Sequence, residues 1–345
     1  MDLYKELTKN INFKNKDLLI ALIGTERFFA HNYKIKIFDF ISDIKQMMNA
    51  EKFSFRKFKD VLFIPGVWPN FGASIILPSM LGAKITWYEN SSPCVSGLVI
   101  KNIDDVNNLK LPDCLKEGFG PWYFNALKRF IEEGSFKNNL NFNWSIGPGE
   151  LAGYLVGIDN LLINMYLDPK IIKKLLSFCT EFIINFLNKQ FEINKFARGF
   201  LLTDDISGLI SKDFYEGFLL PCHIDIRKKF KDKIFIFHND TKSDHIVESL
   251  LNIGMDVFNF GYDTNMDLLI EKMLRPQKVV LMGNIDPTGI LLSKDKVLVK
   301  SNVKELIKKV KTYPGFIISA GGGLNATDPE NINILIEEVK NHNNK

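Results

Sequence analysis

Eight short apolar runs recur along this chain of 345 residues, and each of them ends at a glycine or a polar residue. Short runs that are apolar at nearly every position are typical of parallel strands buried on both faces of a sheet. The eight runs lie at residues 18–24, 61–66, 141–150, 199–205, 233–240, 255–261, 279–286 and 315–323. They therefore predict a mainly parallel sheet.

The segments between these runs have helical patterns, so strands and helices alternate. Eight such repeats predict a single-domain α/β fold over residues 1–345, a (β/α)₈ TIM barrel. A doubly wound open sheet is the alternative, but it predicts a glycine-rich phosphate loop after the first strand, where this chain has Gly24-Thr25-Glu26-Arg27. Residues 67–140 form an insertion after the second barrel strand, long enough for a lid, with an extra strand expected at 86–89.

Helix starts are indicated by capping side chains. Asp168 precedes Pro169 and predicts a helix to Lys189, since proline is favoured at the first helical position. Ser211 and Ser301 are expected to cap helices over 212–229 and 302–311. Thr327 and Glu330 have the spacing of a capping box for a C-terminal helix over 329–340.

Composition and charge exclude several classes of protein. The chain is 46% hydrophobic and 24% charged, with a mean hydropathy of -0.02 and a net charge of +4, so neither a nucleic acid nor a membrane is expected as a partner. Four dispersed cysteines fit reduced thiols better than a disulfide framework. The polar first residues do not resemble a signal peptide, and no apolar stretch is long enough to span a bilayer. We therefore expect a cytoplasmic protein.

In a (β/α)₈ barrel the catalytic residues lie at the carboxyl ends of the strands, so the residues at these ends are the candidates for the site. They are Glu26, Arg27, Trp68, Asn70, Glu150, Asp204, Asp205, His238, Asn239, Asp240, Asn259, Asn284, Asp286 and Gly321 to Gly323. Carboxylates and one histidine thus converge on one rim, together with a single arginine.

His238 and the acids suggest a metal site. An imidazole with carboxylate oxygens from Asp240, Glu150 or Asp205 is a possible zinc ligand set. The alternatives are a hydrogen-bonded structural histidine and an Asp240 that caps the next helix. Of Asp204 and Asp205, one is expected to be a cap and the other functional, because neighbouring side chains alternate in direction.

The remaining rim residues are assigned to catalysis or substrate contact. Asp205 and Asp286 are candidate catalytic acids, although Asp286 precedes a proline and also fits a turn. The glycine run around Gly322 allows the backbone to approach a ligand closely, or forms a flexible turn. The candidate substrate contacts are Arg27, Trp68, Asn70, Glu150, Asn259 and Gly322. The other four histidines, His31, His223, His245 and His342, receive no role.

Six segments together resemble the uroporphyrinogen decarboxylase superfamily from about residue 18 to residue 340. They are GPGELAGYLVGIDNLLINMYLDP (147–169), DDISGLISKDFYEGFLLP (204–221), FHND (237–240), GMDVFNFG (254–261), LMGNIDP (281–287) and SAGGGLNATDPENI (319–332). The resemblance implies a (β/α)₈ barrel, in agreement with the eightfold pattern, and members of the superfamily are often homodimers.

True uroporphyrinogen decarboxylases of this superfamily bind a polycarboxylated tetrapyrrole through an arginine-rich N-terminal motif. In this chain the corresponding segment, GTERFFAH, keeps only Arg27, and Gly322 occupies the position of a family histidine. Several buried carboxylates need several cations, because an unpaired buried charge costs several kcal/mol. The resemblance therefore favours another branch.

That branch transfers methyl groups to or from a corrinoid, and its thiol-activating members bind zinc through His-x-Cys and a later cysteine. This chain keeps the histidine as His238 but has Asp240 and Gly322 at the two cysteine positions, and so is more similar to relatives that demethylate methoxy and other compounds. The resemblance implies zinc on His238 and Asp240 as a Lewis acid, a small methylated donor, and a corrinoid. The chain lacks an Asp-x-His-x-x-Gly corrinoid motif, so the corrinoid is expected on a partner protein.

Two other functions stay open. One is a metal-free decarboxylase or lyase of a small acid, or of a tetrapyrrole-like substrate, with Arg27 holding a carboxylate and His238 or Asp205 handling the proton. The other is a non-catalytic binder of a corrinoid or tetrapyrrole. Bound metal would count against the first, and turnover that depends on His238 would count against the second.

Overall fold

The computed structural model describes residues 3–66, 68–72, 74–133 and 142–344. Its eight-stranded sheet follows the order β2-β1-β10-β9-β8-β7-β6-β5, and all seven neighbouring pairs are parallel. The strands are β1 (Leu19–Ile23), β2 (Val61–Ile64), β5 (Phe142–Ile146), β6 (Gly199–Thr203), β7 (Ile234–Asn239), β8 (Val257–Phe260), β9 (Val280–Ile285) and β10 (Phe316–Ala320). Each lies in one of the eight apolar runs, so the predicted strands are confirmed. Residue 141, the first of the run 141–150, lies outside the described residues.

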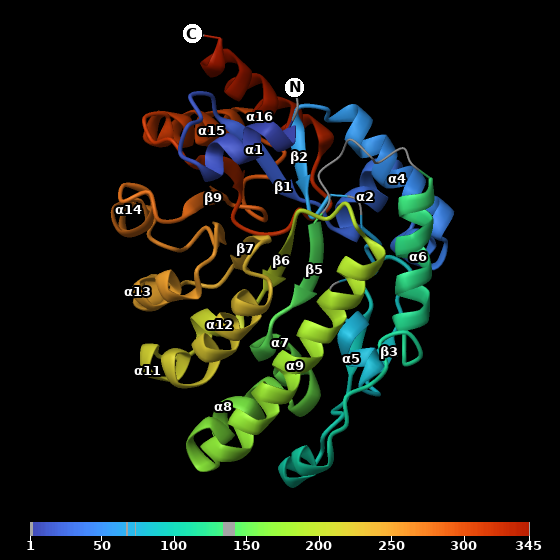
Figure 1. Cartoon of the computed structure of the whole chain (residues 1–345). Helices are drawn as coiled ribbons and strands as arrows, with labels where there is room; N and C mark the ends of the chain where they lie inside the picture. Colours follow the sequence, from blue (N-terminus) through green and yellow to red (C-terminus); the bar gives the residue numbers. More distant parts are fainter. Residues whose placement is uncertain (1–2, 67, 73, 134–141, 345) are drawn as a thin grey trace.

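The first and last strands of this order meet and nearly close the sheet. The backbone N–H of Phe142, at the start of β5, donates a hydrogen bond of 2.9 Å to the carbonyl of Pro65, just after β2. The predicted (β/α)₈ barrel is thereby confirmed. In Figure 1 the strands run towards the end of the molecule that carries α8 (Ile158–Leu167), and the two chain termini lie at the opposite end.

Helices follow the strands around the barrel. Those outside the insertion are α1 (Leu3–Ile11), α2 (Glu26–Tyr33), α3 (Ile37–Ser42), α4 (Ile44–Lys57), α7 (Pro148–Val156), α9 (Pro169–Ile193), α10 (Ile206–Leu209), α11 (Lys212–Phe214), α12 (Leu220–Lys229), α13 (Val247–Leu250), α14 (Met266–Leu269), α15 (Lys296–Val310) and α16 (Pro329–Asn343). The short 3₁₀ or π segments are η2 (Tyr215–Leu219), η3 (Asp244–Ile246), η4 (Leu251–Ile253) and η5 (Ile270–Leu274).

The stretch expected to form an insertion, 67–140, contributes α5 (Ile76–Met80), η1 (Ile103–Asn108) and α6 (Gly120–Glu132). The extra strand forms earlier than expected, as β3 (Lys84–Thr86), and pairs antiparallel with β4 (Cys94–Ser96). Residues 67, 73 and 134–140 of this stretch lie outside the described residues.

Capping side chains mark the starts of several helices. Asp168 accepts the N–H of Ile171 at the start of α9, as predicted, and the helix continues past Lys189 to Ile193. Ser211 accepts the N–H of Phe214, also as predicted. That helix contains the π segment η2 immediately before Leu220-Pro221, where the missing proline N–H interrupts the α-helical pattern.

Two predicted caps are wrong. Asp295, not Ser301, caps α15, accepting the N–H groups of Val297 and Leu298, whereas the Ser301 hydroxyl donates to the Leu298 carbonyl inside the helix. At α16 the cap is Asp328 rather than Thr327, because its carboxylate accepts the N–H of Glu330. An aspartate was available before each helix, and a carboxylate accepts backbone N–H groups more strongly than a hydroxyl does.

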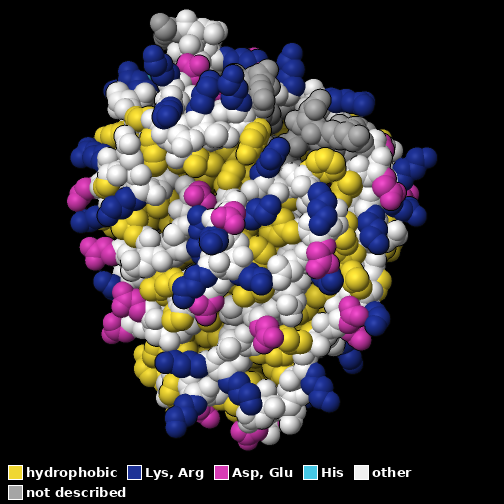
Figure 2. Space-filling model, in the orientation of Figure 1, with side chains coloured by type: hydrophobic (Ala, Val, Ile, Leu, Met, Phe, Trp, Pro, Cys, Tyr) yellow, Lys and Arg dark blue, Asp and Glu magenta, His cyan; other side chains and the backbone are white. Residues whose placement is uncertain are grey.

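The surface carries charges of both signs. On the face shown in Figure 2, Lys and Arg side chains are interspersed with Asp and Glu, without a field of one sign. Among the helices of the described segments, none has the length and apolar character needed to cross a bilayer.

Candidate metal site

Three side chains converge where β6 and β7 end. Asp205 follows β6, His238 is the last residue but one of β7, and Asp240 follows that strand. One ligand atom from each, an imidazole nitrogen and two carboxylate oxygens, can be chosen so that all lie within 4.8 Å of one another. Nitrogen and carboxylate oxygen are both ordinary zinc ligands, so the donor set fits the expected metal.

The imidazole of His238 is oriented by Asn259 on the neighbouring strand. Nδ1 of His238 lies 2.6 Å from Oδ1 of Asn259, and the strand register pairs these residues directly. The amide nitrogen of Asn259 donates to the carbonyls of Met282 and Ala320, so its oxygen must face the histidine. Nδ1 therefore carries the proton, and Nε2 keeps a free lone pair.

This arrangement differs from the substrate contact expected for Asn259. Its side chain is fully buried, and its oxygen and both amide hydrogens are used within the protein. Metal-binding histidines commonly donate their second ring N–H to such an acceptor, which fixes the tautomer and the ring plane. The structure thus places Asn259 behind His238 as its orienting partner.

The two aspartates contact each other. The backbone N–H of Asp240 donates to Oδ1 of Asp205 at 2.8 Å, which ties the two strand ends together. Burial, together with the negative charge of Asp205, raises the pKa of Asp240 to about 6. Two carboxylates held this close repel each other, and a cation between them offsets that cost.

Glu150, from the first turn of α7, reaches the same strand end. Its Oε2 accepts the Thr203 hydroxyl and its Oε1 accepts the backbone N–H of Asp205, both at 3.1 Å. Burial raises the pKa of Glu150 well above its ordinary value, and the charges of Asp205 and Asp204 raise it further. Burial thus favours the protonated form of a carboxyl group directly beside Asp205.

Asp204 is the one of the two neighbouring aspartates that serves as a cap. Asp204 is fully buried and accepts the N–H groups of Gly149 and Glu150, so it caps α7, while Asp205 is partly exposed and belongs to the cluster. The helix-cap alternative for Asp240 does not hold, because the next helical segment, η3, begins at Asp244 with Ser243 at its N-cap position.

Two other candidates, Asp286 and Gly322, also lie near the rim. Oδ1 of Asp286 accepts hydrogen bonds from the N–H groups of Thr288 and Gly289 and from the Thr288 hydroxyl. These contacts agree with the alternative that Asp286 stabilises a turn. A Cβ on Gly322 would lie 3.7 Å from Oδ2 of Asp240, so this glycine borders the cluster.

The remaining expected substrate contacts are Arg27, Trp68 and Asn70. Arg27 donates to Ser92 and Asn325, and its side chain is 52% exposed. Trp68 is buried against Trp144 at a centroid distance of 4.9 Å. Asn70 is buried and donates to the carbonyl of Gly24.

Tyr154 and His223 were not predicted as parts of this region. Tyr154 on α7 is close enough to Glu150 and Asp205 for their charges to raise its pKa, although burial is the larger cause. It lies one helical turn after Glu150, a spacing that places both side chains on one face of α7 and was available in the sequence. His223 is fully buried against Asp204 and carried no such signal.

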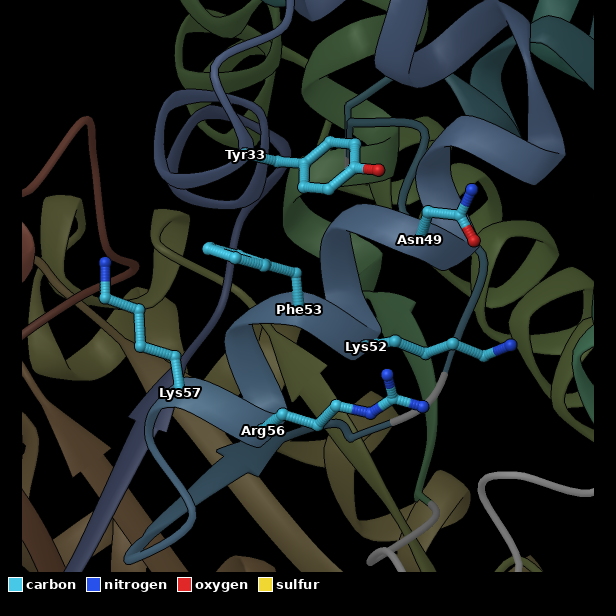
Figure 3. A pocket seen from close by; sticks show the side chains of 6 residues that line it. All are labelled: Tyr33, Asn49, Lys52, Phe53, Arg56 and Lys57. Carbon is cyan, nitrogen blue, oxygen red and sulfur yellow. The ribbon is translucent and has the colours of Figure 1, made fainter.

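A second concave region lies elsewhere, over α4. This groove of about 670 Å³ is lined by Tyr33, Asn49, Lys52, Phe53, Arg56 and Lys57 (Figure 3). Lys52 is paired with Glu133, and Lys57 donates to Asn32. None of these lining residues belongs to the cluster of Asp205, His238 and Asp240, so the groove is separate from the candidate metal site.

Comparison with known protein families identifies the family of this chain. The model of the uroporphyrinogen decarboxylase (URO-D) family matches residues 67–342. The chain belongs to this family. The URO-D resemblance seen in the sequence is thereby confirmed, and family members are enzymes.

Curated URO-D relatives match at low identity. The uroporphyrinogen decarboxylase of Wigglesworthia glossinidia brevipalpis is 27% identical over 287 residues, covering 80% of this chain and 77% of the relative. That of Cupriavidus metallidurans is 24% identical over 297 residues, with the same two coverages.

Solved structures show the same fold. A methyltransferase from Methanosarcina mazei superposes with a TM-score of 0.79 at 16% identity, covering 99% of this chain and 98% of the other. A B12-independent methionine synthase from Shewanella superposes with a TM-score of 0.58 at 11% identity, covering 94% and 97%. At such identities the likeness concerns the barrel alone.

Proposed function

We propose that this protein is a zinc-dependent methyltransferase that moves a methyl group between a small methylated substrate, such as a methoxy compound, and a corrinoid held by a partner protein. The observation that carries the proposal is the cluster of Asp205, His238 and Asp240, with Asn259 leaving Nε2 of His238 free. The structural likeness to a methyltransferase of the same superfamily supports it.

In this proposal His238, Asp205 and Asp240 hold the zinc ion. When bound, zinc supplies a Lewis acid that polarises the heteroatom carrying the methyl group, and the corrinoid supplies the cobalt that accepts or donates the methyl. Asn259 keeps the imidazole in the tautomer that binds metal. The hydrogen bond between Asp240 N–H and Asp205 keeps the two carboxylates facing the same point.

In this proposal Glu150, rather than the candidate acid Asp205, is the proton donor. Burial and the neighbouring charges raise its pKa, which favours the protonated carboxyl group, and it lies one hydrogen bond from Asp205. A leaving alkoxide needs a proton, and a positioned acid of this kind provides it. Asp205 is thereby left to bind the metal.

The charges of the site argue against a polycarboxylated substrate. Glu150, Asp205 and Asp240 lie together, while Arg27 is the one arginine among the strand-end residues and is largely exposed. A tetrapyrrole with several carboxylates would meet repulsion rather than the cationic partners that buried carboxylates need.

The alternative of a metal-free carboxy-lyase has its own support, since the curated relatives are named uroporphyrinogen decarboxylases. In that case Arg27 would bind a substrate carboxylate and His238 would move the proton. This function predicts that activity survives complete removal of metal.

Metal content and methyl transfer test the two functions. The protein is stripped of metal, incubated with zinc, desalted and measured by elemental mass spectrometry, beside His238→Ala and the control His31→Ala, which changes an exposed histidine on α2. We expect about one zinc per chain in the wild type and in His31→Ala, and a loss in His238→Ala. Zinc at the His238→Ala level in the wild type would overturn the metal mechanism.

Methyl transfer is then measured as methylation of a reduced corrinoid protein, with panels of methoxy and other methylated compounds. Transfer that needs both zinc and His238 is the expected result. Metal-free release of carbon dioxide from a small acid, with no methyl transfer, would replace the proposal with the lyase.

A further inference from the structure

His223 and Asp204 form a fully buried pair beneath the candidate metal site. Nε2 of His223, on α12, lies 3.0 Å from Oδ2 of Asp204, which directly follows β6, and both side chains are 0% exposed. The hydroxyl of Tyr215 lies 3.3 Å from the other ring nitrogen, so both nitrogens of the imidazole are engaged. A buried carboxylate is tolerated only where donors surround it.

The same carboxylate fixes the start of α7. Its two oxygens accept the N–H groups of Gly149 and Glu150 at 2.9 and 3.1 Å. A Cβ at Gly147 or Gly149 would lie 2.5 or 2.6 Å from Asp204 atoms, so the close approach requires glycine at both positions. The charge of Asp204 also lies at the positive end of the α7 dipole.

From α7 the contacts return to the metal ligands. Glu150 accepts the backbone N–H of Asp205, and Oδ1 of Asp205 accepts the N–H of Asp240. A continuous series of hydrogen bonds thus runs from His223 through Asp204, Glu150 and Asp205 to Asp240. Because Asp204 and Asp205 are adjacent, a shift of the first carboxylate also moves the backbone that carries the second.

We propose that His223 is a positioning residue for the metal site: through its hydrogen bond to Asp204 it holds Glu150 and Asp205 where Asp205, His238 and Asp240 bind one ion. This inference rests on the proposed function, since it concerns the same site. His223 itself lies beneath the rim and is not a metal ligand.

Two substitutions separate the hydrogen bond from the bulk of the ring. His223→Leu removes the donor to Asp204, whereas His223→Gln retains an N–H at about the position of Nε2. Leu335→Ala, a fully buried change on α16, serves as the control for a loss of stability away from the site. Cobalt(II) is the probe, because its visible spectrum reports ligand geometry as well as affinity.

We expect His223→Leu to weaken cobalt binding about tenfold or more, the scale found for residues that orient metal ligands. Its cobalt spectrum should change, and amide exchange at Gly149 and Glu150 should quicken. His223→Gln should restore wild-type affinity to within about threefold, and Leu335→Ala should lose stability without a change in affinity or spectrum.

Wild-type affinity and spectrum in His223→Leu would overturn the inference while leaving the proposed function intact. Failure of His223→Gln to restore binding would also overturn it, because the hydrogen bond would then not be the cause. A wild-type protein that binds no cobalt overturns both proposals. If His223→Leu does not fold, His223→Asn decides: its shorter amide can keep the contact to Tyr215 but cannot reach Oδ2 of Asp204, and unchanged cobalt affinity and spectrum would overturn the inference.

Discussion

The side-chain oxygen of Asn259 lies 2.6 Å from Nδ1 of His238, and the amide nitrogen of the same asparagine is bound to two backbone carbonyls. Three hydrogen bonds thus fix both the amide and the imidazole. A residue in the barrel wall thereby determines which nitrogen of the rim histidine is available to a metal or a proton.

Asn259→Leu should lower zinc affinity by about 10–100-fold, because His238 loses the acceptor that orients it. Zinc affinity is measured by competition with a chelator. The matched control is Asn331→Leu, since Asn331 is also buried and also donates to two backbone carbonyls, those of Leu291 and Ser293.

Both of these variants should lose stability, since each removes two hydrogen bonds to buried or partly buried backbone carbonyls, at a cost of about 1–3 kcal/mol for each carbonyl left without a donor. Only Asn259→Leu should lose zinc affinity. Equal zinc affinity in the two variants would show that Asn259 does not support the metal site.

Glu51→Gln should stabilise the protein increasingly as pH rises. Glu51 on α4 is fully buried, neither of its oxygens has a hydrogen-bond partner among the described residues, and burial raises its pKa well above 4.5. Above pH 4.5 the unfolded chain releases this proton while the folded chain retains it, so the wild type loses stability as pH rises until the folded pKa is reached.

The two proteins should therefore have similar free energies of unfolding at pH 4, and differ at pH 8 by about 1.4 kcal/mol for each unit of pKa difference between the folded and unfolded states. Denaturant unfolding at both pH values measures this, with the exposed Glu305→Gln as the control. A constant difference across the pH range would contradict a raised pKa at Glu51.

The barrel could be predicted because buried parallel strands are short apolar runs that a sequence displays directly. The rim residues followed from the same pattern, since the end of a run marks the end of a strand. The partner of His238 was less visible: Asn259 lies beside it only because β8 neighbours β7 in that register. His223 meets Asp204 from a helix 19 residues later, a contact that no local pattern encodes.

Helix caps show the same limit, because Ser and Asp are both good caps and only the packed helix selects one. Asp295→Ala should lower the free energy of unfolding by about 0.5–2 kcal/mol, since two N–H groups at the start of α15 lose their acceptor. Ser301→Ala should be neutral or slightly stabilising, because the hydroxyl lies within the helix, where alanine is preferred. A larger loss in Ser301→Ala would contradict the observed start of α15.

Asp286→Asn tests the one candidate catalytic acid that the structure places in a turn. Oδ1 of Asp286 accepts three hydrogen bonds from Thr288 and Gly289, and an asparagine oxygen at the same position accepts the same bonds. Asp286→Asn should therefore keep both stability and zinc affinity, whereas Asp286→Ala should lose about 1 kcal/mol of stability with zinc affinity unchanged. If Asp286→Asn folds and binds zinc but slows turnover a hundredfold or more, the carboxylate charge takes part in the reaction, and the turn is not its main role.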